Sequence, residues 1–88
     1  MRSVQSRTRY RRDIRRLARR GVDISALDPI IDHIAEHGEA PAAARPHLLS
    51  GNWAGMWDCH AAPDWILIYT VDDNTVELIR TGTHSDLF

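Results

Sequence analysis

Three histidines and a carboxylate lie in the second half of the chain, outside the segments with a helical pattern. His47 ends a loop, His60 ends a segment with a strand pattern, and His84 follows the last such segment. Asp64 comes four residues after His60, across a tight turn, so the two side chains can lie at one end of a sheet. A rigid scaffold usually presents its reactive groups at such strand ends and loops.

These residue types fit metal-independent cleavage of RNA. One group must take the proton of a 2′-hydroxyl, another must protonate the departing 5′-oxygen, and a cation must stabilise charge on the phosphate. Histidine suits both proton transfers because its unperturbed pKa is about 6.5. Arg80, expected on the face of Val76 and Leu78 or curling over it, suits the phosphate. A purely structural role also remains open, since Arg80 can pair with Glu77 or Asp58.

Metal binding is a second interpretation of the same histidines and Asp64. No short paired spacing ties them together as zinc ligands are usually tied. His33 and His37 do have helical spacing, but they fit better on the polar side of a helix. We therefore expect no metal and no cofactor.

Positive charge is concentrated at the start of the chain. Residues 1–20 contain nine arginines and one acid, for a net charge of +8, whereas residues 21–88 carry −9. The chain has no lysine, so every fixed cation is a planar guanidinium suited to phosphate or carboxylate. This asymmetry indicates a polyanion or an acidic protein as a partner. The expected RNA-binding arginines are Arg9, Arg12, Arg16 and Arg19.

Two helices are expected in the first half. Tyr10, Ile14, Leu17 and Ala18 form one apolar stripe in a helix over residues 9–20, which Gly21 ends. A second helix is expected from about Ser25, whose side chain can cap it, to Gly38.

Three strands are expected after a loop over residues 39–46. They cover residues 52–60, 64–71 and 75–81, and each follows a turn signal. Residues 65–69 are apolar on both faces, which predicts a central strand covered by the helices on one side. Residues 3–8 are a weaker candidate for an edge strand. The fold class is α+β, a helical hairpin packed on a small antiparallel sheet, in a single domain over residues 1–88.

Size and composition exclude several classes. The lone cysteine, Cys59, rules out an internal disulfide and is expected to be a small buried hydrophobe. The longest apolar run, residues 65–69, is far below the roughly 20 residues of a membrane span. The N-terminal arginines are not followed by an apolar segment, so no signal peptide is expected. A cytoplasmic protein without a membrane partner is the expectation.

Two motifs, CHAAPDWILIY at residues 59–69 and RTGTHSDLF at residues 80–88, resemble the YafQ-like branch of the RelE/ParE toxin superfamily. Residues 46–53 support the resemblance, which extends over almost the whole chain. It implies a RelE-like fold and an endoribonuclease that cuts mRNA in the ribosomal A site. It also implies 2′-hydroxyl attack without a metal, contact with ribosomal RNA, and inhibition by a cognate antitoxin. Operator DNA would be bound only through the toxin–antitoxin complex.

The same resemblance implies a set of site residues. The residue matching His84 is the family's usual general acid, and the one matching Asp64 or a neighbouring histidine is the base. Trp65 is implied as an RNA-binding residue. The full set is His47, His60, Asp64, Trp65, Arg80, His84 and Phe88.

Two positions depart from the family pattern and keep alternatives open. Pro46 stands where relatives usually have aspartate, and Trp57 where a basic residue is common. An inactive relative that only binds antitoxin or operator is therefore one alternative. A non-enzymatic topoisomerase poison of the ParE-like branch is another, although that branch generally lacks the histidine-rich site.

Overall fold

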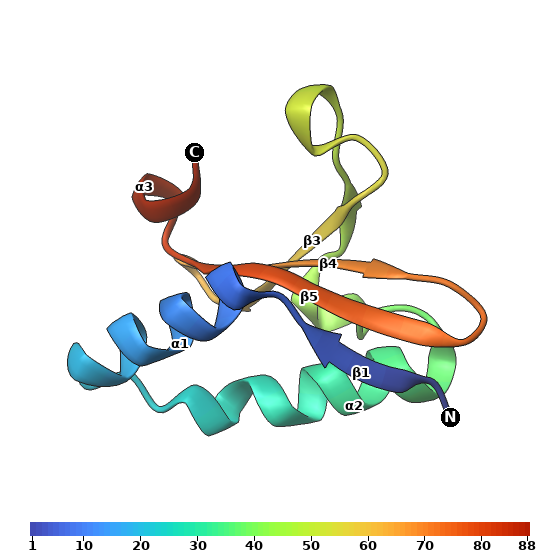
Figure 1. Ribbon diagram of the computed structural model, residues 1–88, viewed down its shortest axis with the longest axis horizontal. Helices are drawn as coiled ribbons and strands as arrows, with labels where there is room; N and C mark the ends of the chain where they lie inside the picture. The colour runs from blue at the N-terminus through green and yellow to red at the C-terminus, as the bar shows by residue number, and fades with distance from the viewer.

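Helices α1 and α2 lie on one side of a five-stranded sheet, while α3 and the segment before β3 rise on the other side (Figure 1). The computed structural model describes all residues from 1 to 88. The strands are β1 (Ser3–Ser6), β2 (His47–Leu48), β3 (Trp57–Ala62), β4 (Trp65–Val71) and β5 (Thr75–Gly82). The helices are α1 (Thr8–Arg19), α2 (Asp28–His37) and α3 (His84–Leu87), with 3₁₀ turns η1 (Ile24–Leu27), η2 (Ala42–Ala44) and η3 (Gly51–Trp53). None of the helices has the length and apolar composition needed to cross a lipid bilayer.

The strand order is β1-β5-β4-β3-β2. Strands β3, β4 and β5 form the expected antiparallel meander, and β2 adds antiparallel to β3. The weak N-terminal candidate is a real edge strand, β1, and it pairs in parallel with β5. The α+β class and the helix-on-sheet arrangement are confirmed.

Central strand β4 divides the apolar side chains between two cores. Leu67 and Tyr69 face α1 and α2 and belong to the main core, which also contains Cys59. Ile66 and Ile68 face the other way, into a smaller cluster with Ile79 and Leu87. The expected two-faced central strand and buried cysteine are confirmed. We call the side carrying Ile66 and Ile68 the open face, because α1 and α2 do not cover it (Figure 1).

A bulge in β5 corrects one expectation. Ile68 pairs with Arg80 but the next residue, Tyr69, pairs with Leu78, so Ile79 is an extra residue in the ladder. A bulge shifts the alternation of faces beyond it. Arg80 therefore lies on the open face with Ile68, and not on the helix-covered face with Leu78 as its spacing suggested.

The strand expected over residues 52–60 begins only at Trp57. Gly51 and Gly55 adopt positive φ values of 65° and 86°, which extended strands do not have. Residues between them turn through η3, so Trp53 and Trp57 do not share a strand face. Trp53 packs against the open-face cluster and Trp57 against the main core.

The start of the second helix also differs from expectation. Asp23, not Ser25, is the cap: its carboxylate accepts a hydrogen bond from the Ser25 N–H at 3.1 Å. This caps η1, and α2 follows from Asp28. Its end at Gly38 is as expected, with a left-handed φ of 79°.

Candidate active site

Sheet pairing places several expected site residues in two neighbouring rows on the open face. In one row His47 lies opposite Asp58, which lies opposite Ile68, which lies opposite Arg80. In the next row His60 lies opposite Ile66. Partners directly opposite one another share a face of the sheet. The open face therefore carries His47, Asp58, His60 and Arg80 on three different strands.

His84, Asp64 and His60 form a compact group at one end of these rows. The Asp64 carboxylate accepts a hydrogen bond from the His84 backbone N–H at 3.1 Å and lies 2.8 Å from His84 Nδ1. The His60 and His84 rings have centroids 5.9 Å apart. Hydrogen bonds from His84 hold the pKa of Asp64 below its usual value. Asp64 is thus an ionised partner that orients the His84 ring and leaves Nε2 free of protein partners.

Two buried polar atoms on β3 lack hydrogen-bond partners. They are Nδ1 of His60 and Oδ1 of Asp58, which is 3.7 Å from His47 Nδ1. Buried polar atoms without partners are rare in folded proteins and often occur at functional sites. Asp58 is a residue that sequence reasoning treated only as a structural pairing option. Its signal is the two-residue spacing to His60, which puts both on one face of a strand.

Aromatic side chains extend the group along the open face. Phe88 lies 6.4 Å from His84 and 5.6 Å from Trp53, centroid to centroid. Trp53, Phe88, His84 and His60 thus form a continuous line of rings. Phe88 is 58% exposed, which leaves its ring accessible to a bound molecule.

Trp65 does not join this line. It packs against the main core on the helix-covered side, and its indole N–H donates to Thr81 Oγ1 at 2.9 Å. Trp65 also lines a small pocket with Asp64 and Thr83, and the tryptophan in the line of rings is Trp53.

His47 and Arg80 are three strand spacings apart, on β2 and β5. Three strand spacings of about 4.8 Å put their backbones about 14 Å apart. His47 is exposed on edge strand β2, with Asp58 as its near neighbour. The structure therefore brings His60, Asp64, His84 and Phe88 together and leaves His47 at the far rim.

Arg80 is held by Asp13, the one acid of α1. Asp13 accepts from Arg80 Nε at 2.7 Å and Nη2 at 3.2 Å, and from the Thr81 backbone N–H at 3.1 Å. The pairing of β1 with β5 ends at Ser6 and Leu78, so no strand lies beside Thr81 to take that N–H. Neither Glu77 nor Asp58 is the partner of Arg80. Its Nη1 remains free of protein partners.

Helix α3, which begins at His84, is fixed to α1 through Asp86. Asp86 and Thr83 form a reciprocal capping box, and Arg20 binds the Asp86 carboxylate at 2.9 Å. Arg16 lies 3.7 Å from the same carboxylate. The hydrogen bonds from Arg20 and Thr83 hold the pKa of Asp86 well below its usual range.

Replacing Asp86 by asparagine is expected to lower stability at neutral pH and to make it less sensitive to acid. Because folding depresses the pKa of Asp86, its stabilisation is present above the unfolded value of about 3.9 and is lost as pH falls further. Asparagine keeps an acceptor for the Thr83 N–H but has no charge for Arg20. Urea unfolding between pH 7 and pH 2.5 gives the free energy of unfolding of both proteins. The difference between wild type and variant should become smaller below about pH 4. A difference in the free energy of unfolding that does not change with pH would contradict this role of Asp86.

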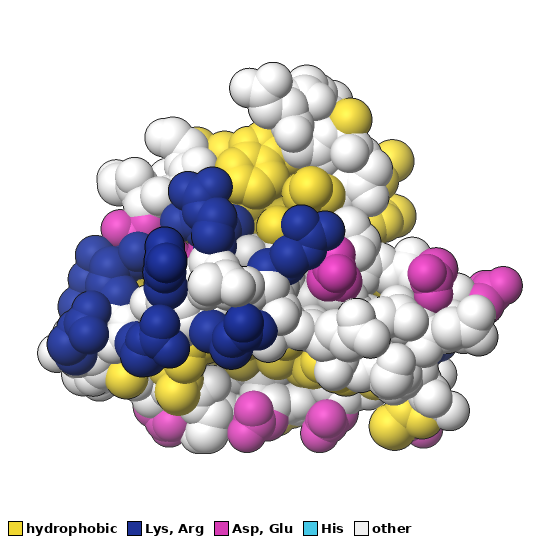
Figure 2. Space-filling view, in the orientation of Figure 1, with side chains coloured by type: hydrophobic (Ala, Val, Ile, Leu, Met, Phe, Trp, Pro, Cys, Tyr) yellow, Lys and Arg dark blue, Asp and Glu magenta, His cyan; other side chains and the backbone are white.

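Most of the arginines lie in α1 or at its two ends. Figure 2 shows their side chains clustered over this helix, beside an apolar patch. Arg9, Arg12, Arg16 and Arg80 surround Asp13 in a small notch of about 180 Å³. Arg19 is exposed farther along the helix. Three of the four expected RNA-binding arginines therefore line one notch.

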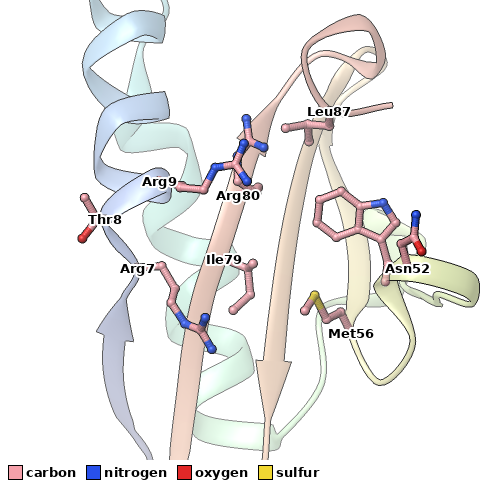
Figure 3. Close-up of a pocket in the computed structure, with 9 residues that line it drawn as sticks. Arg7, Thr8, Arg9, Asn52, Met56, Ile79, Arg80 and Leu87 are labelled. Atoms are coloured by element: carbon pink, nitrogen blue, oxygen red, sulfur yellow. The ribbon is translucent and has the colours of Figure 1, made fainter.

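A larger groove of about 680 Å³ lies next to the notch, between α1 and the η3 turn (Figure 3). Arg7, Arg9 and Arg80 line one side. Asn52, Trp53 and Met56 line the other, with Ile79 and Leu87 between them.

The two departures from the family pattern lie away from the open face. Trp57 packs on the helix-covered side, where it and Pro46 line a small pocket with Tyr69. Neither side chain lies among the site residues. No group of three or more histidine, cysteine or carboxylate side chains is arranged to hold a metal ion.

Known proteins resemble this chain over its whole length. Residues 2–88 match the family described as "Bacterial toxin of type II toxin-antitoxin system, YafQ". The mRNA interferase toxin YafQ of Escherichia coli strain K12 is 34% identical, over 99% of this chain and 96% of that protein.

Solved structures agree with the sequence match. A crystal structure of a YafQ mutant from E. coli superposes with a TM-score of 0.90 at 32% identity, covering 100% of this chain and 99% of that one. The toxin in the E. coli DinJ–YafQ toxin–antitoxin complex superposes with a TM-score of 0.87 at 34% identity, covering 99% of this chain and 97% of that one. The family expected from the two C-terminal motifs is confirmed, and the chain belongs to the YafQ family of bacterial toxins of type II toxin–antitoxin systems.

Proposed function

We propose that this toxin is an mRNA interferase, an endoribonuclease that inhibits translation by cutting mRNA in the ribosomal A site without a metal. One observation carries the proposal: His84, oriented by Asp64, faces His60 on the same side of the sheet as Arg80. Two imidazoles and a guanidinium are the groups that a 2′-hydroxyl attack on a phosphodiester requires. Its YafQ relatives bear the name mRNA interferase toxin, which supports this assignment.

The geometry favours particular roles for the histidines. Asp64 is engaged with His84 and its lowered pKa makes it a weak base, so His60 is the better group to take the 2′-hydroxyl proton. The 2′-oxygen then bonds to phosphorus, and the bond to the 5′-oxygen breaks. His84 gives that oxygen a proton from Nε2, and the other product is a 2′,3′-cyclic phosphate. Arg80, through its free Nη1, binds the charged phosphate.

Other members of the expected set have supporting roles in this proposal. Phe88 offers a ring face beside His84, suited to stacking on a base. His47, at the far rim beside Asp58, contacts the RNA strand and not the reacting atoms. The arginines of α1 bind ribosomal RNA. A cognate antitoxin is the protein partner, as DinJ is for YafQ of E. coli, and the cytoplasm is the site of action.

Growth arrest on induction tests the proposal. The wild-type chain should stop growth, and primer extension should map new ends within messages under translation. His84→Ala should be harmless although it folds and binds the antitoxin. The matched control is His37→Ala, an exposed histidine on α2, which should remain toxic.

Two outcomes would contradict the proposal. Equal toxicity of wild type and His84→Ala would remove the histidine from the mechanism. DNA damage without cleaved messages would indicate a topoisomerase poison instead.

A further inference from the structure

The groove of Figure 3 has an apolar side that nothing in the proposed cleavage step uses. Trp53 and Met56 are half-buried. Ile79 and Leu87, at the middle of the groove, are buried, with exposed fractions of 7% and 8%. Trp53 touches Phe88 at one edge, so the groove continues the line of rings that includes His84. An aromatic ring in an accessible apolar groove next to a catalytic group is suited to a flat, partly apolar ligand.

The opposite side of the groove is strongly positive. Arg9 lines both the groove and the notch beside it and makes no ion pair. Arg12, in the notch, also has none, while Arg7 is paired with Glu77 at 2.7 Å. The groove and notch contain five arginines, and the carboxylates within ion-pair distance of them are those of Asp13, Glu77 and, at Arg16, Asp86. Five positive charges against three negative ones leave a local excess of positive charge. A phosphate group on the ligand would be attracted to this side.

We propose that this groove and notch bind one nucleotide of the RNA strand next to the cleaved bond, its base against Trp53 and Met56 and its phosphate at Arg9 and Arg12. The proposal rests on the proposed function, since it places this nucleotide beside Arg80 and the cleaved phosphate. The volume of about 680 Å³ is in the range of sites that hold small ligands, about 300–1,000 Å³.

Charge and shape favour a nucleotide over an acidic peptide. A nucleotide carries a flat base and a phosphate only one sugar apart, which matches an aromatic ring facing arginines across one groove. Asn52 is exposed at the rim on the Trp53 side. Its amide can both donate to and accept from a base edge, so it is the residue best placed to discriminate between bases.

Binding of a short RNA that cannot be cleaved tests the groove separately from catalysis. A fluorescent oligoribonucleotide with a 2′-deoxy sugar at the cut position is titrated with the purified chain, and anisotropy gives the affinity. Trp53→Ala should weaken binding by roughly 5- to 150-fold, the effect of losing one stacked base. Trp53→Phe should keep most of the affinity, because a ring face remains.

An exposed arginine provides a second variant that leaves the apolar packing intact. Arg9→Gln should lower the slope of log affinity against log salt by about 0.7, the change for one phosphate contact to a single strand. The matched control is Arg45→Gln, which removes the same charge from an exposed position outside α1, the groove and the notch and should leave the slope unchanged.

The outcomes separate this proposal from the proposed function. If Trp53→Ala and Arg9→Gln both bind the RNA as tightly as the wild type, the groove assignment is overturned. The proposal of mRNA cleavage would not be affected by that result. Loss of antitoxin binding in both variants with unchanged RNA binding would assign the groove to the protein partner and overturn the proposal. Absence of cleaved messages from induced wild type would overturn the proposed function, whatever the anisotropy shows.

Discussion

Replacing Asp13 by alanine is expected to lower the free energy of unfolding by about 3–5 kcal/mol, the usual effect of removing one partner from a buried ion pair. The Asp13 side chain is 2% exposed and that of Arg80 is 11% exposed. Alanine would leave the Arg80 guanidinium largely buried without its partner. It would also leave the Thr81 N–H, at the part of β5 that β1 does not cover, without an acceptor. The total free energy of unfolding of a small domain is only about 5–15 kcal/mol, so the variant should be close to unfolding.

Urea unfolding measures this effect directly. The matched control is Asp73→Ala, which removes a carboxylate from the exposed turn between β4 and β5 and should change stability by no more than about 0.5 kcal/mol. Asp13→Asn should lie between wild type and alanine, because an amide oxygen can still accept from Thr81 while the charge is lost. A loss below about 1 kcal/mol for Asp13→Ala would show that water replaces the carboxylate, and that the pair does not fix α1 to β5.

The parts of the fold that could be predicted from sequence are those with a strong local pattern. Residues 65–69 are apolar at every position, and the central strand β4 follows from that alone. The apolar positions Tyr10 and Leu17 and the glycine after the helix identify α1 to within one residue at each end. The burial of Cys59 follows from the small apolar character of a free thiol.

The parts that could not be predicted depend on contacts between distant segments. The bulge at Ile79 arises from the pairing of β5 with β4, and no residue type in β5 marks it. Without the bulge, the alternation of faces places Arg80 on the wrong side of the sheet. Asp13 is a single acid among arginines in the sequence, and its importance appears only when α1 lies beside Thr81. The two-residue spacing puts Asp58 on the strand face of His60, but its place opposite His47 follows only from the pairing of β2 with β3.

Some of the site residues are indicated by their spacing and others by the family motifs. Spacing alone suggested that His60 and Asp64 lie at one end of the sheet, and both contact or face His84 there. The family motifs added Phe88 and Trp65, of which only Phe88 lies in the line of rings. Trp53 lies in the η3 turn and not in a strand, so its place next to Phe88 appears only in the fold.

Removing either His60 or His84 is expected to slow cleavage of a defined message on the ribosome by about 10²–10⁴-fold, the contribution of a positioned general acid or base. The double variant should be slowed by much less than the product of the two losses, because the groups act in one step and each depends on the other. Single-turnover rates of His60→Ala, His84→Ala and the double variant measure this coupling. Losses that multiply fully would mean that the two histidines act independently.

The pH dependence of the same rates separates catalysis from structural support. The wild type should give a bell-shaped profile, since it needs one imidazole as a base and the other as an acid. Each single variant should lose one limb of the bell, and the lost limbs should differ between the two variants. Asp64, whose pKa is held low by His84, stays ionised throughout this range, so Asp64→Asn should reduce the rate while keeping both limbs. If His60→Ala and His84→Ala lost the same limb, the two histidines could not be the acid and the base of one reaction.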